Sequence, residues 1–418
     1  MENVAHALAG ALLAEGVIQL RARSGSPPSL REARWLVAGS ALANNLPDLD
    51  VTYAYAADGP LGYLLHHRGH THTLLGGVVL GVVFGVVLVL LARWRKVDLE
   101  ARWLLGLCAL GPLVHVAMDG WNVYGVHPFW PIDDAWYYGD AVFIFEPLLW
   151  AAAMPPLLFA TSSRGWRITL GALLVMACVL PWLASAFVPL ELRIAFPIVV
   201  ALLSLVAWRA GPGLRAVIGL ASFAAVAGGF FAVSSMARSD VQERLARDFP
   251  EARTADVALS PWPANALCWS AVAIQVDGGD LVLRRATVSA VPSVFPASDC
   301  PSPGERSTAE LAEVDAPSDE ALAYRGEARV RIARLARLAE ESCEAQAMLQ
   351  FTRAPFLVDR AESVVLGDLR FDRDEGLDFA ELELDPDAPR CPPLPAPWLQ
   401  PLQDMLSSSE SDGGSRAE

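Results

Sequence analysis

Long apolar segments alternate with short polar connections through the first 235 residues of the chain. A helix that crosses a bilayer needs about 20 predominantly apolar residues, and residues 74–92 and 168–188 meet this requirement. The pattern therefore predicts an α-helical polytopic membrane domain of seven or eight apolar helices, some of them short. The predicted helices cover residues 4–20, 35–46, 74–92, 104–118, 142–160, 168–188, 194–208 and 216–235.

Two of these segments, residues 35–46 and 104–118, are short for a membrane span and run directly into acidic or histidine residues. Pro47 ends the first of them, because the residue before a proline disfavours helical backbone. Lipid does not accept unpaired polar groups, whereas a cavity lined by protein does. We therefore expect both helices to end at a polar site inside the protein.

From residue 239 onward the pattern changes to shorter, mixed elements. Two β-rich runs, residues 267–276 and 281–288, flank an Asp-Gly-Gly-Asp turn, and this arrangement predicts a β-hairpin. We expect a smaller α+β soluble domain over residues 239–390, and the Pro-, Ser- and acid-rich end, residues 391–418, is predicted to be a disordered tail. The other expected elements are helices at 238–249 and 327–339 and strands at 346–358, 363–371 and 377–384.

The charge divides at the same point. Residues 1–238 hold 15 Lys and Arg against 14 Asp and Glu, whereas residues 239–418 hold 17 against 33. The sequence thus predicts a neutral membrane domain over residues 1–238 and an acidic soluble domain after it. An acidic surface repels phosphate backbones, so nucleic acid is not an expected partner. Membrane lipid is an expected partner, and the acidic domain is a candidate surface for a protein partner.

The charges of the connecting loops predict the orientation in the membrane. The loops at 21–34, 93–102, 161–167 and 209–215 hold twelve Lys and Arg against three acids, and the alternate loops hold two against eight. Because cytoplasmic loops carry the Lys and Arg excess, both chain ends and the histidines are expected outside. Four cysteines of the acidic half then lie in a compartment that permits disulfides, and three pairings are open. They are Cys268, Cys300, Cys343 and Cys391.

Histidine and acidic residues gather at the predicted outer ends of the first four helices. Each group alone has an ordinary explanation, such as a buried histidine, a helix-end turn or a hydrogen-bonded pair. Ionisable groups at membrane depth are costly and tend to be functional, so four groups on one side favour a single metal site. The groups are His6, then Asp48 and Asp50, then His66, His67, His70 and His72, and finally His115 with Asp119 one helical turn later.

These motifs resemble those of the YdjM-type membrane-bound metal-dependent hydrolases, which are bacterial inner-membrane proteins. Thr73 stands where the family usually has serine, and His66 and His70 are additional to its motif. The acidic half is similar to the family's C-terminal extension through Asn265-x-x-x-Trp269 and Asp368-Leu369-Arg370-Phe371. The motifs in the first half are Leu46-Pro47-Asp48-Leu49-Asp50, His67-Arg68-Gly69-x-Thr71-His72-Thr73, His115-x-x-x-Asp119, Tyr124-Gly125-Val126-x-Pro128-Phe129-x-Pro131 and Trp136-Tyr137-Tyr138-Gly139-Asp140.

The resemblance implies a multi-pass inner-membrane metal-dependent hydrolase, and the loop charges predict that its site lies at the outer, extracytoplasmic interface of that membrane. A divalent metal ion, zinc first, would activate water to attack an ester or phosphoester, and the substrate would be a small molecule or lipid-linked. We predict Asp48 or Asp140 as general base and Arg68 as the group that holds an anionic substrate. The predicted ligands are His6, Asp50, His67, His72, His115 and Asp119, with His66, His70, Thr71 and Asn122 supporting them.

Two other functions are compatible with the same residues. A transporter for a metal ion or small solute would also use intramembrane histidines and acids, but it needs a continuous polar path. The cytoplasmic halves of the helices are almost purely Val, Leu, Gly and Ala, which argues against such a path. An adaptor would use the histidines as a structural metal clip and its acidic domain to bind partners.

Overall fold

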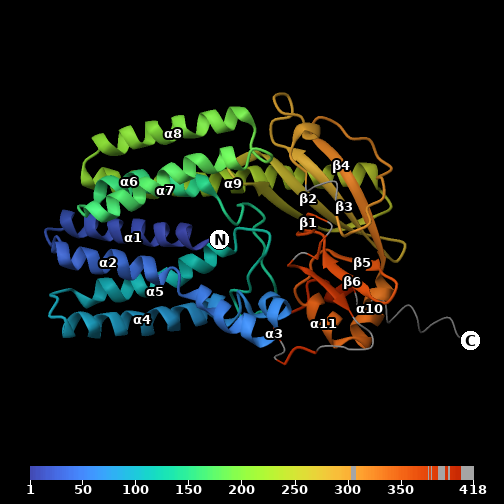
Figure 1. Ribbon diagram of the computed structural model, residues 1–418, viewed down its shortest axis with the longest axis horizontal. Coiled ribbons are helices and arrows are strands. Elements are labelled where there is room, and N and C mark those ends of the chain that lie inside the picture. Colours follow the sequence, from blue (N-terminus) through green and yellow to red (C-terminus); the bar gives the residue numbers. More distant parts are fainter. Residues whose placement is uncertain (303–306, 375, 378, 385–390, 394–395, 406–418) are drawn as a thin grey trace, which may run out of the picture.

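The computed structural model describes residues 1–302, 307–374, 376–377, 379–384, 391–393 and 396–405. Helices of the first part of the chain run side by side in a bundle, and the strands of the second part pack against one end of it (Figure 1). The predicted fold class, a polytopic helical domain followed by an α+β domain, is confirmed. The bundle region contains α1 (Asn3–Arg23), α2 (Leu30–Ala43), α3 (Val51–His66), α4 (Leu74–Trp94), α5 (Ala101–Asp119), α6 (Pro147–Ala160), α7 (Arg164–Leu183), α8 (Leu190–Arg209) and α9 (Pro212–Asp248).

Six helices in the described part of the chain are long and apolar enough to cross a membrane, namely α1, α4, α5, α7, α8 and α9. The apolar helix α6 is shorter, and α2 has only 14 residues. The expected short helix at 104–118 is extended at both ends to form α5, which is therefore a candidate span. The expected short helix at 35–46 stays short, since α2 ends at Ala43.

Helix α3 lies where the sequence pattern indicated only a connecting loop. Pro60 stands inside it, and a proline within a helical pattern argues against a helix. The buried side chains of Leu61, Leu64 and Leu65 pack into the same core as residues of the C-terminal half. Contacts with distant parts of the chain therefore stabilise α3, and the local pattern could not predict them.

The predicted boundary between residues 238 and 239 falls inside α9. Buried side chains recur every three or four residues along this helix, from Phe223 through Phe230 and Val241 to Leu245. This stripe packs against α1 and α6 at one end and against the strands at the other. One continuous helix therefore joins the two halves, and the change in charge at residue 239 does not mark a break in it.

The C-terminal half begins with a four-stranded antiparallel sheet in the order β1-β2-β3-β4. The predicted hairpin is present as β2 and β3, with Asp277 paired to Asp280 across the turn. The edge strand β1 was not expected, because Pro261 near its end is unusual in a strand. The strands are β1 (Arg253–Trp262), β2 (Asn265–Asp277), β3 (Asp280–Ser289) and β4 (Leu322–Arg331).

Both faces of this sheet are covered. Trp269 and Ala273 of β2 face the core shared with α1, α6 and α9, whereas Val272 and Ile274 face the core shared with α3. Alternate residues of a strand point to opposite faces, so covering both faces requires a nearly continuous apolar run. The sheet therefore lies between the helical bundle and the second layer of the C-terminal half.

That second layer contains two short helices and a three-stranded antiparallel sheet in the order β5-β6-β7. The helix expected at 327–339 begins only at Ile332, because the preceding residues pair with β3 as strand β4. The strand expected at 346–358 is divided, since Ser342 caps a helix that ends at Leu349. The elements are α10 (Ile332–Glu341), α11 (Cys343–Leu349), β5 (Pro355–Asp359), β6 (Val364–Asp368) and β7 (Glu381–Leu384).

The segment after residue 390, predicted to be a disordered tail, is packed as far as it is described. Cys391 forms a disulfide with Cys343, and Cys268 pairs with Cys300. Trp398 is 3% exposed, and its indole Nε1 donates a hydrogen bond to the carbonyl of Leu65 at 2.7 Å. The disulfide and the buried indole hold residues 391–393 and 396–405 against the protein, and residues 406–418 lie outside the described part.

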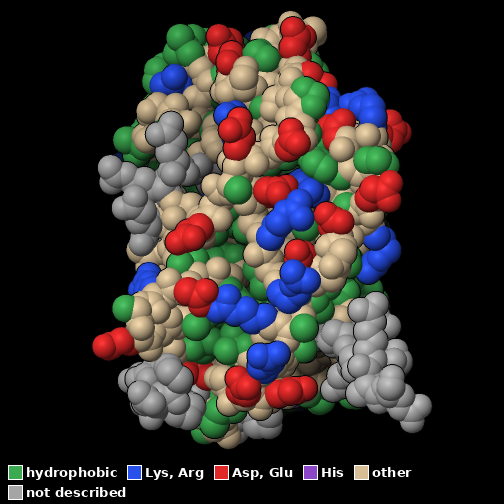
Figure 2. Space-filling model, turned by 90° about the vertical axis from the view of Figure 1, so that its right-hand side faces the viewer, with side chains coloured by type: hydrophobic (Ala, Val, Ile, Leu, Met, Phe, Trp, Pro, Cys, Tyr) green, Lys and Arg blue, Asp and Glu red, His purple; other side chains and the backbone are tan. Residues whose placement is uncertain are grey.

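Acidic and basic side chains are intermixed on the face of the C-terminal half that points away from the bundle (Figure 2). Many of the exposed charges in this half are paired, as in Arg360 with Glu383 at 3.2 Å and Arg329 with Asp277 at 3.4 Å. Part of the negative charge of this half is therefore compensated by arginines.

Candidate metal centre

Four side chains of the types that bind metals meet where two short 3-10 turns lie beside the C-terminal end of α5. Asp48 lies on the 3-10 turn η1 (Pro47–Asp50) after α2, and His72 lies on η2 (His70–His72) after α3. His115 and Asp119 occupy successive turns at the end of α5, and this spacing places them on one helical face. One ligand atom from each of these four residues lies within 4.8 Å of all the others. We call these four residues the candidate metal centre.

Tight packing between α4 and α5 fixes the position of the two α5 residues. Gly77, Gly81 and Gly85 form a stripe of buried glycines on α4. A Cβ at Gly81 would collide with the carbonyl of Cys108, and one at Gly77 would lie 3.2 Å from Pro112. Small residues allow helices to approach closely inside membranes, so this stripe sets the distance of α5 from α4, which begins directly after η2.

The distances within the centre fit a metal ion. The Nε2 atoms of His72 and His115 are 3.1 Å apart, and Asp119 Oδ2 lies 3.2 Å and 3.5 Å from them. Asp48 Oδ1 lies 3.5 Å from Nε2 of His72 and 3.4 Å from Nε2 of His115. Ligand atoms about 2.0–2.2 Å from a tetrahedral zinc ion are separated from one another by roughly 3.3–3.6 Å. The five separations that involve a histidine nitrogen, 3.1–3.5 Å, are therefore close to those of a zinc-sized site.

Hydrogen bonds on the far side of each imidazole determine which nitrogen can bind a metal. The Nδ1 of His115 lies 2.6 Å from the carbonyl oxygen of Asn44. Because a carbonyl only accepts, this Nδ1 carries the proton and Nε2 presents a lone pair to the centre. The Nδ1 of His72 lies 3.0 Å from Asp50 Oδ2. A carboxylate or carbonyl partner of this kind is the usual support of a metal-binding histidine.

Asp50 is thus placed behind His72 and outside the centre. It also accepts hydrogen bonds from Thr71 Oγ1 at 2.8 Å and from the backbone N–H of Arg68 at 3.0 Å, and it lies 2.9 Å from Nδ1 of His67. Burial raises the pKa of the Asp50 carboxyl, but its hydrogen bonds with His67 and His72 outweigh burial and hold that pKa well below its usual range. Asp50 and His67, both predicted as ligands, therefore support the loop that carries His72.

The side chain of Arg68, which was predicted to hold a substrate anion, is buried and directed toward Asp119 and Asn122. Its Nε lies 3.0 Å from Asp119 Oδ2, and its Nη1 donates to the carbonyl of Asp119 and to Asn122 Oδ1, each at 3.0 Å. Its guanidinium lies over the ring of Tyr124 at 4.5 Å. With 1% of its surface exposed, Arg68 orients Asp119 and is not placed to contact a substrate in this structure.

The carboxylate of Asp119 is buried, and within the described residues neither of its oxygens accepts a hydrogen bond of good geometry. Its charged contacts are with Arg68, with the amino group of Met1 and with His6, whose Nε2 lies 3.3 Å from Oδ1. The ring of His6 stacks on His115 at 3.7 Å. A buried carboxylate whose neighbouring donors form no well-aligned hydrogen bond keeps acceptor capacity for a metal ion, and His6 lies directly behind it.

Three other predicted residues lie near the centre but not in it. His66 is the last residue of α3 and is buried. His70 is exposed and meets the ring of Trp130 edge-on at 4.6 Å. Asn122 accepts from Arg68 and from the backbone N–H of Tyr124. These placements make Asn122 a support of Arg68, whereas His70 belongs to an aromatic contact.

Asp140, predicted as an alternative general base, lies among arginines of the C-terminal half and α9. Its two oxygens accept from Arg353 at 2.9 Å and 3.0 Å, and Arg238 donates to it at 2.5 Å. After Asp119 the chain turns back on itself, because Ala141 N–H donates to the carbonyl of Trp121 at 2.8 Å. This turn carries Asp140 to the contact with the C-terminal half, where it acts as an ion-pair partner.

Asn44, whose carbonyl sets the tautomer of His115, is not among the residues predicted from the sequence. Only a weak pattern indicates this role, namely two consecutive asparagines in the apolar segment directly before Leu46 and Pro47. Tyr124 belongs to a predicted motif, but its contact with Arg68 was not predicted because it depends on the loop conformation. Backbone carbonyls and aromatic contacts of this kind follow from the fold and have no residue-type signature.

Comparison with known proteins agrees with these observations. A family model described as YdjM inner membrane protein matches residues 1–190. The uncharacterized protein YfhP of Bacillus subtilis (strain 168) is 25% identical over 149 residues, which are 36% of this chain and 43% of that protein. The chain thus aligns with less than half the length of this relative. No solved structure matches this chain. Residues 1–190, which hold the whole candidate metal centre, therefore match the YdjM inner membrane protein family. This confirms the resemblance predicted from the motifs of the first half, and the match does not extend to the motifs at 265–269 and 368–371.

Proposed function

We propose that this protein is a membrane-embedded, metal-dependent hydrolase that cleaves an ester or phosphoester at the membrane interface. The observation that supports this function is the convergence of two imidazole Nε2 atoms, from His72 and His115, with the carboxylates of Asp48 and Asp119. Imidazole and carboxylate ligands suit zinc or a similar divalent ion. Such an ion would supply Lewis acidity toward water and toward an ester or phosphoryl oxygen.

In this proposal His72, His115 and Asp119 hold the ion and Asp48 accepts the proton. The side chains of the first three are at most 1% exposed, whereas that of Asp48 is 17% exposed. Three protein ligands with one open position are typical of catalytic zinc. Asn3 donates to Asp48 Oδ2 at 2.8 Å, which leaves Oδ1 directed toward the centre. Asp48 is thus the carboxylate of this group that water and substrate can reach.

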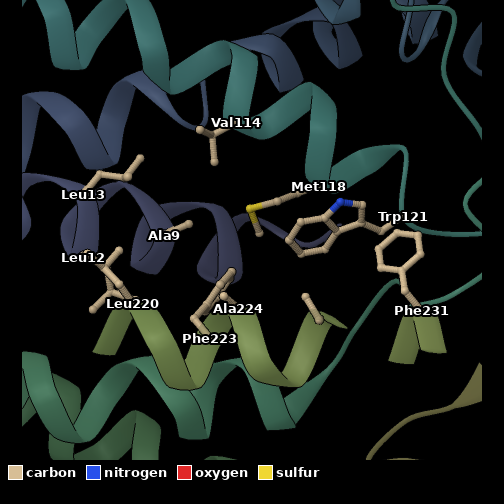
Figure 3. A pocket seen from close by; sticks show the side chains of 11 residues that line it. Ala9, Leu12, Leu13, Val114, Met118, Trp121, Leu220, Phe223, Ala224 and Phe231 are labelled. Carbon is tan, nitrogen blue, oxygen red and sulfur yellow. The ribbon is translucent and has the colours of Figure 1, made fainter. Parts of the chain in front are cut away.

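A lipid-linked substrate is favoured by the surroundings of the centre. An apolar groove of about 390 Å³ lies between the candidate spans α1, α5 and α9 (Figure 3). Val114 and Met118 of its lining directly precede His115 and Asp119 along α5, and Ala9 lies one turn after His6 on α1. Hydrocarbon chains can therefore approach the helices that carry the ligands, and an amphiphile could reach the interface beside them.

Replacement of Asp48 by asparagine tests the proposed chemistry. At equal metal content the variant is expected to hydrolyse bis-p-nitrophenyl phosphate or p-nitrophenyl acetate at least about 10²-fold more slowly in detergent, because an amide cannot accept the proton. Turnover by the wild type should also disappear after chelation and return when zinc is added. The matched control is Asp98→Asn, since Asp98 is exposed in the loop between α4 and α5. Equal turnover by Asp48→Asn and wild type would contradict the assigned role, and metal that binds without any turnover would favour a structural clip.

We also propose that the centre and the C-terminal half lie on the extracytoplasmic side. Both occupy the same end of the helical bundle (Figure 1), so a single orientation applies to the two. The Lys and Arg excess in the loops at the opposite end supports this orientation. The disulfides Cys268–Cys300 and Cys343–Cys391 agree with it, because disulfides persist in oxidising compartments.

Labelling of single introduced cysteines in intact cells tests the orientation. A cysteine at Ile132, which is 94% exposed beside the C-terminal half, is expected to react with a membrane-impermeant maleimide. A cysteine at Ser26, in the exposed loop between α1 and α2, should react only after the cells are broken. The reverse pattern would place the centre on the cytoplasmic side. Cys108 is buried and the four cysteines of the C-terminal half are paired. The remaining free thiol, the half-buried Cys178, is replaced by alanine in both variants to keep the background low.

A further inference from the structure

The C-terminal half contacts the loop that holds Arg68 against Asp119. The guanidinium of Arg370 donates from Nη1 to the carbonyl of Val123 at 2.7 Å. Arg370 itself is fixed by Asp368, which accepts from its Nη2 at 2.7 Å and from its Nε at 3.0 Å. Both side chains are fully buried. A residue of the C-terminal half therefore binds the backbone of the segment 122–125 through a rigid, charged group.

The same segment provides most of the hydrogen-bond acceptors of Arg68. Asn122 Oδ1 and the carbonyl of Gly125 accept from its Nη1 at 3.0 Å and 3.2 Å. The ring of Tyr124 lies beneath its guanidinium and packs on Phe351 of the C-terminal half at 4.9 Å between ring centroids. Val123, which Arg370 binds, stands between these contacts in the sequence. Movement of the segment would thus displace the partners of Arg68.

Arg68 in turn contacts both the carboxylate and the backbone carbonyl of Asp119, a member of the candidate metal centre. A continuous series of buried polar contacts therefore runs from Asp368 and Arg370 to a metal ligand. We propose that Arg370 is a positioning residue of the metal centre, which acts on Asp119 through the segment 122–125 and Arg68. The C-terminal half is then part of the machinery that sets metal affinity, and the Asp-Leu-Arg-Phe motif has a physical role. This inference rests on the proposed metal site but not on the hydrolytic reaction.

The test measures zinc affinity by competition with a chelator, on the full-length protein in detergent. Arg370→Gln is expected to raise the Kd for zinc by roughly 10–100-fold, which is the usual effect of removing a support of a metal ligand. Arg370→Lys should restore part of the affinity, because an ammonium can still donate to the carbonyl of Val123. The matched control is Arg284→Gln, since Arg284 is also buried in the C-terminal half, and its guanidinium hydrogen bonds go to Glu327 at 2.9 Å and to Gln275, outside both 122–125 and the motif at 368–371. Its zinc Kd should stay at the wild-type value even where its thermal stability falls.

A double-mutant cycle separates positioning from general loss of stability. Asn122→Ala and Arg370→Gln both act through Arg68, so their combined effect on the zinc Kd should be smaller than the product of the single effects. Independent, multiplicative effects would overturn the proposal, and so would an unchanged Kd in Arg370→Gln. If that variant does not fold, Arg370→Lys and Arg284→Lys provide the same comparison. A wild type that binds no zinc would refute the proposed function itself, which is a different outcome from zinc binding that ignores Arg370.

Discussion

Purified wild-type protein is expected to carry about one or two equivalents of a transition metal, and His72→Ala should lose essentially all of it. In the wild type the Nε2 of His72 lies 3.1 Å from the Nε2 of His115 and 3.2 Å from Oδ2 of Asp119. The variant removes this nitrogen from the centre. In the proposed assignment only His115 and Asp119 would remain as ligands, whereas catalytic zinc sites use three protein ligands and structural zinc sites four. Metal content measured by atomic emission on protein purified without added metal provides the readout.

The control for this experiment is His70→Ala, two positions away. His70 is exposed and contacts Trp130, so its removal is expected to leave the metal content unchanged. Asp119→Asn serves as a second variant of the centre, because an amide keeps the size of the side chain but is a weaker ligand. Full metal occupancy in both His72→Ala and Asp119→Asn would show that these residues do not form the site.

Asp140→Asn is expected to destabilise the protein by up to about 3–5 kcal/mol, because it removes one of the two carboxylates that pair with the buried Arg353 and also a partner of Arg238. Asp140 is fully buried, and the side chain of Arg353 is 5% exposed. Burial alone lowers the pKa of the Arg353 guanidinium, but the carboxylates of Asp140 and Asp256 outweigh burial and raise that pKa above its usual value. In the variant the guanidinium stays protonated at any working pH, with Asp256 at 2.7 Å as its remaining carboxylate partner. Thermal and denaturant unfolding of the purified protein measure the loss.

An exposed ion pair of the same half provides the comparison. Arg334 and Asp359 are 46% and 68% exposed, and exposed pairs contribute about 0–1 kcal/mol. Asp359→Asn should therefore leave the unfolding midpoint almost unchanged. A stable Asp140→Asn that has lost hydrolytic activity at full metal content would instead support the general-base role predicted from the sequence.

Some features of this protein were determined by local pattern alone. Among helical segments a bilayer accepts only long apolar ones, so runs such as 74–92 and 168–188 predict membrane-spanning helices without any other information. The pair His115 and Asp119 is one helical turn apart, and that spacing places both on one face in any α-helix. The Asp-Gly-Gly-Asp turn between two β-rich runs likewise forms its hairpin from local geometry. These features need no information from distant residues.

The roles of individual charged residues were decided only by the tertiary structure. Asp48, Asp50 and Asp140 have the same functional group, and nothing in their local sequence shows that the first lies in the centre, the second supports His72 and the third binds Arg353. Arg68 in the same way points at Asp119 because the segment 122–125 encloses it. The pairing of β4 with β3, the choice of disulfide partners and the formation of α3 also depend on contacts between residues far apart in the chain. Sequence pattern reports which groups are present near one another along the chain, but the free energy that selects their partners comes from burial and pairing across the whole fold.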